Sequence, residues 1–156
     1  MPSLEFFVVC RNVSMDVETD EVTLANVIED VYLDEDGKAF LSQAAAVSSW
    51  NLGEGDTPTD SQTILRITRP GETEGSDFPT NLQIGRHRYR GISVVTDIPL
   101  DKPGLLLFEL FLNAKHAAGH TVIVHPPEAR IHEGMQLAPK NEKGTGQVGR
   151  IKKTAK

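Results

Sequence analysis

Short apolar runs separated by turn-rich segments recur along the chain about every 10–20 residues, a spacing typical of strands. Clear examples are "LEFFVVCR" at 4–11, "QTILRIT" at 62–68 and "HTVIVHPP" at 120–127. Their Val, Ile and Phe content favours β-strands, and no convincing helical stretch stands between them. We therefore predict an all-β fold, an antiparallel β-sandwich of about seven or eight strands.

The charge is unevenly distributed along the chain, and this suggests where the sandwich domain ends. Residues 134–156 carry six Lys/Arg and one Glu, few apolar residues and four glycines. Such a segment buries too little surface to offset its ordering entropy. We predict a sandwich domain at 1–133 and a flexible basic C-terminal tail at 134–156. With a net charge of −6 overall, the body carries −11, which disfavours nucleic acid as its partner.

Cysteine content and hydropathy bear on location. The chain has one cysteine, Cys10, so an internal disulfide framework is excluded. No run approaches the roughly 20 apolar residues of a membrane helix. The N-terminal apolar run lacks a basic region before it and is followed by Arg11, unlike a signal peptide. We predict no membrane association and a reducing, cytoplasmic location.

Two segments fit either a strand or a helix. At 21–33, "EVTLANVIEDVYL" has helical spacing, yet it also alternates in two halves, and we favour a strand with a bulge near Asn26. At 105–118, a helix would place His116 and His120 side by side. We favour a hairpin in which "GLLLFELFL" and "HTVIVH" pair across a short "NAKHAAG" connection, with both histidines in or beside the turn.

Other segments are interpreted more simply. The alanines of "AFLSQAAAVSSW" at 39–50 weaken its prediction as a strand. The segments 51–61 and 72–81 are rich in Gly, Pro and acidic residues and are predicted as loops. The segment 82–100 supplies one or two strands, with bends at its glycines.

The order of these features carries a resemblance. An opening apolar strand leads to "CRNVSMD", then "EVTLANVIEDVYL", "LRITRPGE" and finally "PLDKPGLLLFELFLNAKHAAGHTVIVHP". This order resembles a bacterial family of uncharacterised β-sandwich proteins, a domain of unknown function, over roughly residues 4–126. The resemblance implies a fold and no activity, because none of these motifs is a catalytic signature.

The segment "RHRYR" at 86–90 is the candidate ligand site. On a strand, Arg86, Arg88 and Arg90 project from one face, and His87 and Tyr89 from the other. Guanidinium groups spaced about 7 Å apart suit a phosphate or polyanion, and the aromatic side chains suit a flat ligand. The alternative is a solvated face whose arginines pair with carboxylates of neighbouring strands.

Metal sites and catalytic groups have weaker support. His116 and His120 lack the acidic residue of an HExxH motif, and His125 is expected at a strand end. Acidic loops at 15–21, 34–37, 54–60 and 71–77 invite calcium, but none follows the EF-hand pattern, and turn preference explains them equally well. No GxSxG or phosphate-binding glycine loop is present. Cys10 lies in an apolar strand and is predicted to be an inert core thiol.

These observations predict a non-enzymatic binding or assembly module without metal or cofactor. Its partner is expected to be a protein or a second copy of the chain, reached through a sheet face or an edge strand. One alternative is a small-ligand or anion-binding sandwich that uses Arg86, Arg88, Tyr89 and Arg90. Another is a divalent-metal-dependent enzyme built on the acidic loops or the histidine turn.

Overall fold

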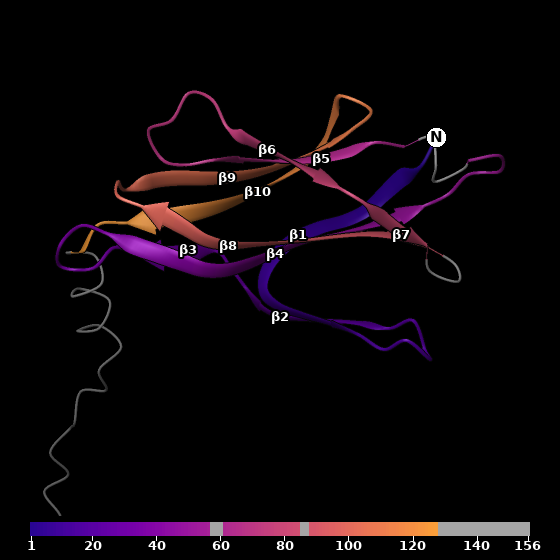
Figure 1. The fold of residues 1–156 in the computed structure, drawn as a ribbon, viewed down its shortest axis with the longest axis horizontal. Coiled ribbons are helices and arrows are strands. Elements are labelled where there is room, and N and C mark those ends of the chain that lie inside the picture. The colour runs from indigo at the N-terminus through magenta and orange to yellow at the C-terminus, as the bar shows by residue number, and fades with distance from the viewer. Residues whose placement is uncertain (57–60, 85–87, 128–156) are drawn as a thin grey trace, which may run out of the picture.

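A computed structural model of the chain describes residues 1–56, 61–84 and 88–127. These residues form ten strands in two sheets packed face to face (Figure 1). The predicted β-sandwich is confirmed, with more strands than expected. The predicted tail at 134–156 lies outside the described residues.

Sheet A contains five strands in the order β2-β1-β4-β8-β7. Their bounds are Val22–Val27 for β2, Ser3–Met15 for β1, Ala39–Asn51 for β4, Tyr89–Leu100 for β8 and Leu82–Ile84 for β7. All four neighbouring pairs are antiparallel. The long strands β1, β4 and β8 therefore form the centre of this sheet.

Sheet B contains five strands in the order β3-β10-β9-β5-β6. Their bounds are Asp30–Tyr32 for β3, Lys115–His125 for β10, Gly104–Leu112 for β9, Thr63–Thr68 for β5 and Ser76–Thr80 for β6. The short β3 runs parallel to β10, while the other pairs are antiparallel. The sequence had suggested a purely antiparallel sandwich, and the parallel pairing of β3 with β10 departs from that prediction.

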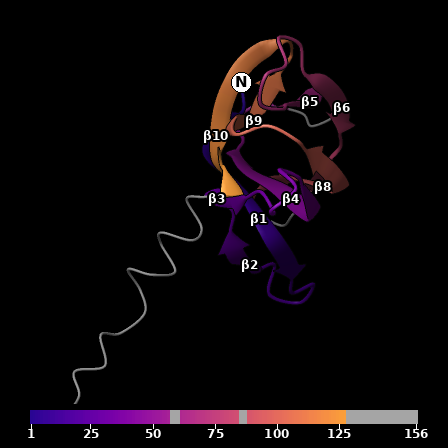
Figure 2. The same cartoon turned by 90° about the vertical axis from the view of Figure 1, so that its left-hand side faces the viewer.

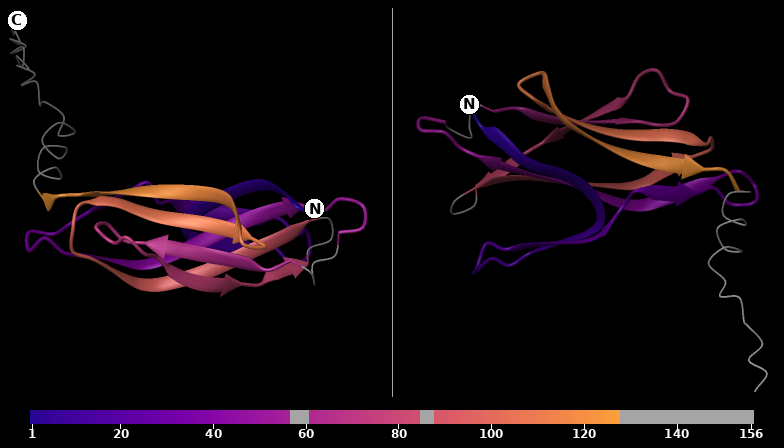
Figure 3. Two further views of the ribbon diagram at one scale, coloured as in Figure 1. Left: turned by 90° about the horizontal axis from the view of Figure 1, so that it is seen from above. Right: turned by 180° about the vertical axis from the view of Figure 1, so that it is seen from behind.

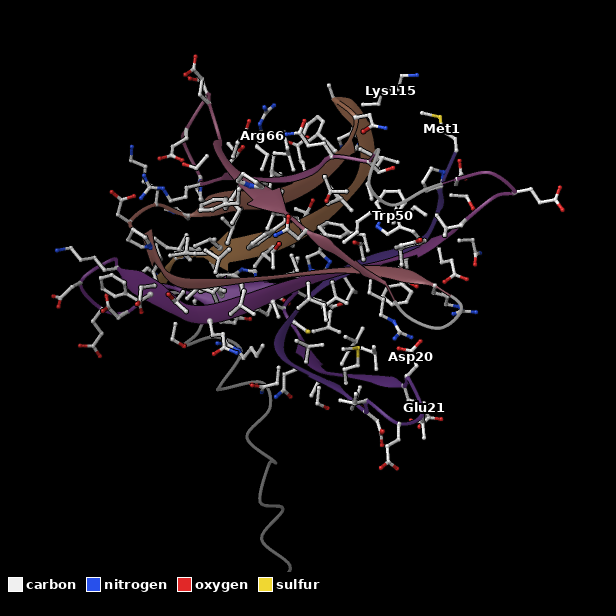
Figure 4. The ribbon with its side chains drawn as sticks, turned by 45° about the vertical axis from the view of Figure 1, so that its right-hand side comes forward. Met1, Asp20, Glu21, Trp50, Arg66 and Lys115 are labelled. Carbon is white, nitrogen blue, oxygen red and sulfur yellow. The ribbon has the colours of Figure 1, made fainter. Side chains whose placement is uncertain are left out.

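The core lies between the two sheets and is built from alternate residues of their strands. On β9, Leu106, Phe108, Leu110 and Leu112 are all buried. Trp50 of β4 is also buried, and its indole Nε1–H donates to Ser48 Oγ at 2.9 Å. Figure 4 shows Trp50 between the layers. Strand alternation therefore fixes which residues fill the sandwich.

The predicted strand at 21–33 is divided between the two sheets. β2 pairs with β1, and the chain then passes to sheet B, where β3 pairs with β10. Asn26 has a φ of 58°, a left-handed conformation that asparagine adopts more readily than most residues. The bulge predicted near Asn26 is absent, because the register of β1 with β2 does not shift there. The segment is extended and not helical.

The hairpin predicted at 105–125 is confirmed, but its turn is shorter than expected. Only Asn113 and Ala114 connect β9 to β10, with φ values of 48° and 63°. Two successive positive φ values are typical of a type I′ turn, whose twist matches that of the strands. His116 and His120 therefore both lie on β10, and a register shift separates them.

One predicted loop contains a strand. The segment 72–81 was expected to lack regular structure, but its residues Ser76–Thr80 form β6 at the edge of sheet B. Asp77 and Pro79 have low strand propensity, which hid the strand in the sequence. An edge position tolerates proline, because one side of the strand needs no backbone donor.

The outer face of sheet A is covered by part of its own first strand. β1 pairs with β4 as far as Cys10 and with β2 from Cys10 to Met15. The second half of β1 bends back beneath the sheet, and β2 follows it (Figure 3, right; Figure 2). We call residues 11–27 the arm. It forms a partial third layer beyond sheet A.

The arm explains the alanine-rich strand. On β4, Ala44 and Ala46 face the core between the sheets, while Ala45 and Val47 pack under the arm with Cys10. All five residues are buried. The strand is therefore enclosed on both faces, and small side chains allow both layers to approach it closely. This two-sided burial explains why alanines, which weakened the strand prediction, occupy the middle of β4.

Candidate interaction surfaces

The predicted ligand site at 86–90 is only partly within the described residues. Arg86 and His87 lie outside them, Arg88 precedes β8, and Tyr89 and Arg90 begin that strand. Tyr89 packs into the core beside Trp50, whereas Arg90 faces the arm. The predicted alternation is therefore found for Tyr89 and Arg90. Because it is buried, the Tyr89 ring does not offer a face for stacking on a ligand.

The two arginines of this segment that the structure describes, Arg88 and Arg90, both contact carboxylates. Arg88 Nη1 lies 3.2 Å from Glu5 Oε2, and Ser49 Oγ donates to the same oxygen at 2.8 Å. Arg90 Nη1 lies 2.8 Å from Asp20 Oδ1. An anion at this face would have to displace these partners. The geometry matches the alternative of paired arginines more closely than an open anion site.

Cavity size also bears on the small-ligand alternative. An apolar depression of about 240 Å³ opens between β6 and β8. Its apolar lining residues are Ile67, Phe78, Val95, Ile98 and Pro99. This volume is smaller than the roughly 300–1,000 Å³ of usual small-molecule sites. This depression therefore does not strengthen the case for a small ligand, whereas a more polar one of about 350 Å³ beside Arg66 and Glu109 reaches the lower end of that range.

The histidines of β10 are separated by the structure. His116 pairs with Phe111 on the outer face and lies 3.6 Å from Glu109 Oε1. His120 pairs with the buried Phe108, and its Nε2 donates to the Ile28 carbonyl at 2.6 Å. The two side chains point to opposite faces of sheet B, so they do not form a metal-binding pair.

Two of the acidic loops organise their own backbones. Asp16 Oδ1 accepts hydrogen bonds from the backbone N–H groups of Glu18 and Thr19. Asp34 Oδ1 accepts bonds from the N–H groups of Asp36 and Lys38. These are Asx turns, in which a carboxylate completes the turn. Over the described ranges, no three His, Cys, Asp or Glu residues gather closely enough to hold a metal ion.

Cys10 is buried beneath the arm. Its side chain has no exposed surface, and its thiol lies 3.2 Å from the Asn12 carbonyl oxygen. Burial raises the pKa of the Cys10 thiol above its ordinary value, because the thiolate would lose its hydration. A protonated, covered thiol is a poor nucleophile. The prediction that Cys10 is buried is confirmed, but it lies under the arm and not in the core between the sheets.

The outer faces of the two sheets differ in how far other segments cover them. Seen from above, no described segment covers its strands (Figure 3, left). Leu105 of β9 is 54% exposed, and Ile123, its cross-strand partner on β10, is 46% exposed. The buried Leu106 and Val122 lie next to them in sequence and face the core. Adjacent exposed apolar side chains are a feature of interaction surfaces.

Charged and aromatic side chains extend this face. Arg66 of β5 forms a two-point contact with Asp77, at 2.7 and 2.9 Å, and its guanidinium lies 4.8 Å from the centre of the Phe111 ring. His116 contacts Phe111 edge-on, with 5.5 Å between ring centres. Figure 4 shows Arg66 on the outer side of sheet B. Aromatic residues and arginine are enriched where proteins bind each other.

The sequence did not identify the partners of the arginines. Glu5 and Asp20 are distant from Arg88 and Arg90 in the chain, and only the sheet order and the bend of β1 bring them together. The aromatic and charged group around Phe111 was also missed. A usable signal was present, because the alternation of β9 places Leu105, Glu109 and Phe111 on one face.

Comparisons with models of known protein families find no match, and neither does a comparison with curated proteins. The resemblance to a bacterial β-sandwich family therefore stays a prediction. No helix among the described residues is long and apolar enough to cross a membrane.

Proposed function

We propose that the chain is a non-enzymatic binding or assembly module whose partner is a protein, and that the outer face of sheet B makes the contact. The observation that carries this proposal is the exposed cross-strand pair of Leu105 and Ile123 on a face that no described segment covers. Burying such side chains against a partner gains about 25 cal/mol per Å² of apolar surface. We place this module in a bacterial cytoplasm, which the single cysteine and the family resemblance support.

The charge pattern favours a second copy of the chain as the partner. Residues 1–133 carry a net charge of −11, so two copies repel each other over most of their surfaces. On the outer face of sheet B, however, Arg66 pairs with Asp77, and Glu109 lies beside His116. A face whose charges are already paired with one another repels an identical face less than a face with unpaired negative charges does. A symmetric contact between two such faces is therefore the assembly to test.

The test is native mass spectrometry of the untagged protein from its own cells, with sedimentation of the purified chain over a range of concentrations. We expect a defined multiple of the chain mass. Leu105→Lys should abolish the multiple, because a desolvated lysine in the interface would lack a partner.

Val94→Lys is the matched control. Val94 is also 54% exposed, but it lies on β8 of sheet A, so this variant should assemble like the parent chain. A chain that stays monomeric at every concentration would reject self-association. A complex with a different protein that survives Leu105→Lys would reject the outer face of sheet B as the contact.

A further inference from the structure

The arm has few backbone ties to the rest of sheet A. Within the described residues, β2 pairs only with β1, and β1 stops pairing with β4 at Cys10. At the base of the arm, Gln43 Nε2 donates to the Arg11 carbonyl at 3.0 Å. A two-stranded ribbon is marginally stable alone. The arm therefore depends on what it touches across the face of the sheet.

The underside of the arm closes a small apolar cluster. Val13 and Leu24 of the arm pack on Cys10, Ala45 and Val47. These last three residues have no exposed surface. Their burial depends on the arm, because they face away from the core between the sheets. Few apolar contacts hold this layer compared with the main core, which favours local opening.

The tip of the arm is held by Arg90. Its Nη1 lies 2.8 Å from Asp20 Oδ1 and 3.8 Å from Met15 Sδ. The Arg90 side chain is only 11% exposed and that of Asp20 only 20%. A charge pair with this little exposure is screened less than one on the surface. The contact ties the turn between β1 and β2 to the start of β8.

The base of the arm has an irregular backbone. Asn26 takes a φ of 58°, and two residues later the Ile28 N–H donates to the Val9 carbonyl at 2.9 Å, where the chain leaves for sheet B. A residue in the left-handed region next to a fixed point suits a hinge. The other strand of the arm bends beside Cys10, where its pairing with β4 ends.

We propose that the arm opens and closes as a unit over the outer face of sheet A, hinged beside Cys10 and at Asn26 and held shut at its tip by the Arg90–Asp20 contact. Opening exposes the Cys10 thiol together with Ala45 and Val47 while the sandwich stays folded. This inference does not depend on the proposed function, which concerns the opposite sheet.

Cys10 reports the opening directly, because it is the only cysteine in the chain. The experiment measures the rate at which a thiol reagent modifies the full-length protein at pH 8, without denaturant and at several low urea concentrations. We expect slow modification whose rate depends only weakly on urea, because opening the arm exposes far less surface than unfolding the domain.

Two substitutions remove the tip contact from either side. Arg90→Gln and Asp20→Asn should each accelerate modification about tenfold, the size expected for a partly buried charged hydrogen bond. Asparagine suits the φ of 61° at position 20 as well as aspartate does, so backbone strain is not introduced. Arg69→Gln and Glu72→Gln remove an ion pair beside sheet B, in the turn after β5, and should leave the rate unchanged.

Either of two results would overturn the proposal. One is modification of the parent chain at the rate and with the urea dependence of global unfolding, measured in parallel by fluorescence of Trp50. The other is an acceleration by Arg90→Gln and Asp20→Asn no larger than that produced by the two sheet B controls. Faster modification in the tip variants, with unchanged global unfolding, would support a hinged arm.

Discussion

His125 Nε2 lies 2.6 Å from Asp30 Oδ1, joining two strands whose residues are 95 positions apart in the chain. The imidazole of His125 also stacks on the ring of Tyr32, with 4.6 Å between centres. Both contacts fasten β3 to β10, the parallel pair at the edge of sheet B. A three-residue strand has few backbone hydrogen bonds, so its side chains contribute much of its attachment.

Removing the carboxylate from this pair should loosen β3. We expect Asp30→Ala to lower the free energy of unfolding by about 0.5–1 kcal/mol, since the pair is partly exposed to solvent. His125→Phe should cost a similar amount, because it keeps the stacking on Tyr32 and loses the contact with Asp30. Urea unfolding at pH 7 measures both. Equal stability of the parent chain and both variants would show that the contact contributes nothing.

The β9–β10 turn offers a stabilising substitution. Ala114 has a φ of 63°, and this conformation costs a residue with a Cβ about 1 kcal/mol relative to glycine. Ala114→Gly creates the Asn-Gly sequence that type I′ turns prefer and should raise the free energy of unfolding by about 0.5–1 kcal/mol. Ala118→Gly, within β10, is the control and should lower it. Destabilisation by Ala114→Gly would contradict the turn geometry.

Gly91 is required by the close approach of two strands. A Cβ at this position would lie 2.7 Å from Ser48 Oγ, the atom that accepts the Trp50 indole hydrogen bond. We expect Gly91→Ala to destabilise the chain by about 1–3 kcal/mol through overpacking.

A double-mutant cycle separates this clash from a general loss of strand geometry. Gly91→Ala should cost less in a Ser48→Ala background, because the oxygen atom that it meets is absent. Thermal unfolding of the four chains measures the coupling. Full additivity would show that Ser48 is not the obstacle.

The loss of stability at acid pH is expected to depend on two carboxylates, Asp77 on β6 and Asp16 in the turn after β1. A hydrogen bond from Arg66 holds the pKa of Asp77 below its ordinary value, and the N–H groups of Thr19 and Glu18 do the same for the pKa of Asp16. A carboxyl whose pKa is lower in the folded state adds stability above its unfolded pKa, about 3.9. That contribution is lost as the pH falls through the lower folded value.

Stability should therefore decline from about pH 5 downward. Asp77→Asn should make the decline shallower, since the amide does not titrate. Urea midpoints between pH 7 and pH 2.5 check this. If the urea midpoint fell equally steeply with decreasing pH in Asp77→Asn and in the parent chain, the assignment of Asp77 would be refuted.

The sequence was sufficient for the fold class because strand alternation and turn residues are local signals. It identified the hairpin through "GLLLFELFL" and "HTVIVH" and the buried Cys10. It also predicted a bulge at Asn26, which the constant register of β1 with β2 rules out. It did not reveal the bend of β1, because nothing in the alternation of a strand says where it leaves one neighbour for another. The alanines at 44–46 were the available signal, since small residues facing both sides of a strand indicate cover on both sides.

The candidate site was harder to predict than the fold. Tyr89 and Arg90 were placed on opposite faces correctly, because that depends only on neighbouring residues. The carboxylates that meet Arg88 and Arg90 come from β1 and the arm, and their approach depends on sheet order, which the sequence does not encode locally. Long-range pairing therefore decided what the arginines bind.

The pairing of β3 with β10 also has a consequence for the order of events during synthesis. On the ribosome, β1 and β2 emerge early and can pair at once, because they are neighbours in the chain. β3 emerges soon after but has no strand partner until residues 123–125 have left the exit tunnel. The side chain of Val31, which is buried in the complete fold, therefore stays uncovered until nearly the whole domain has been synthesised. A nascent chain stalled before residue 123 is expected to leave this edge of sheet B exposed to chaperones and to other chains.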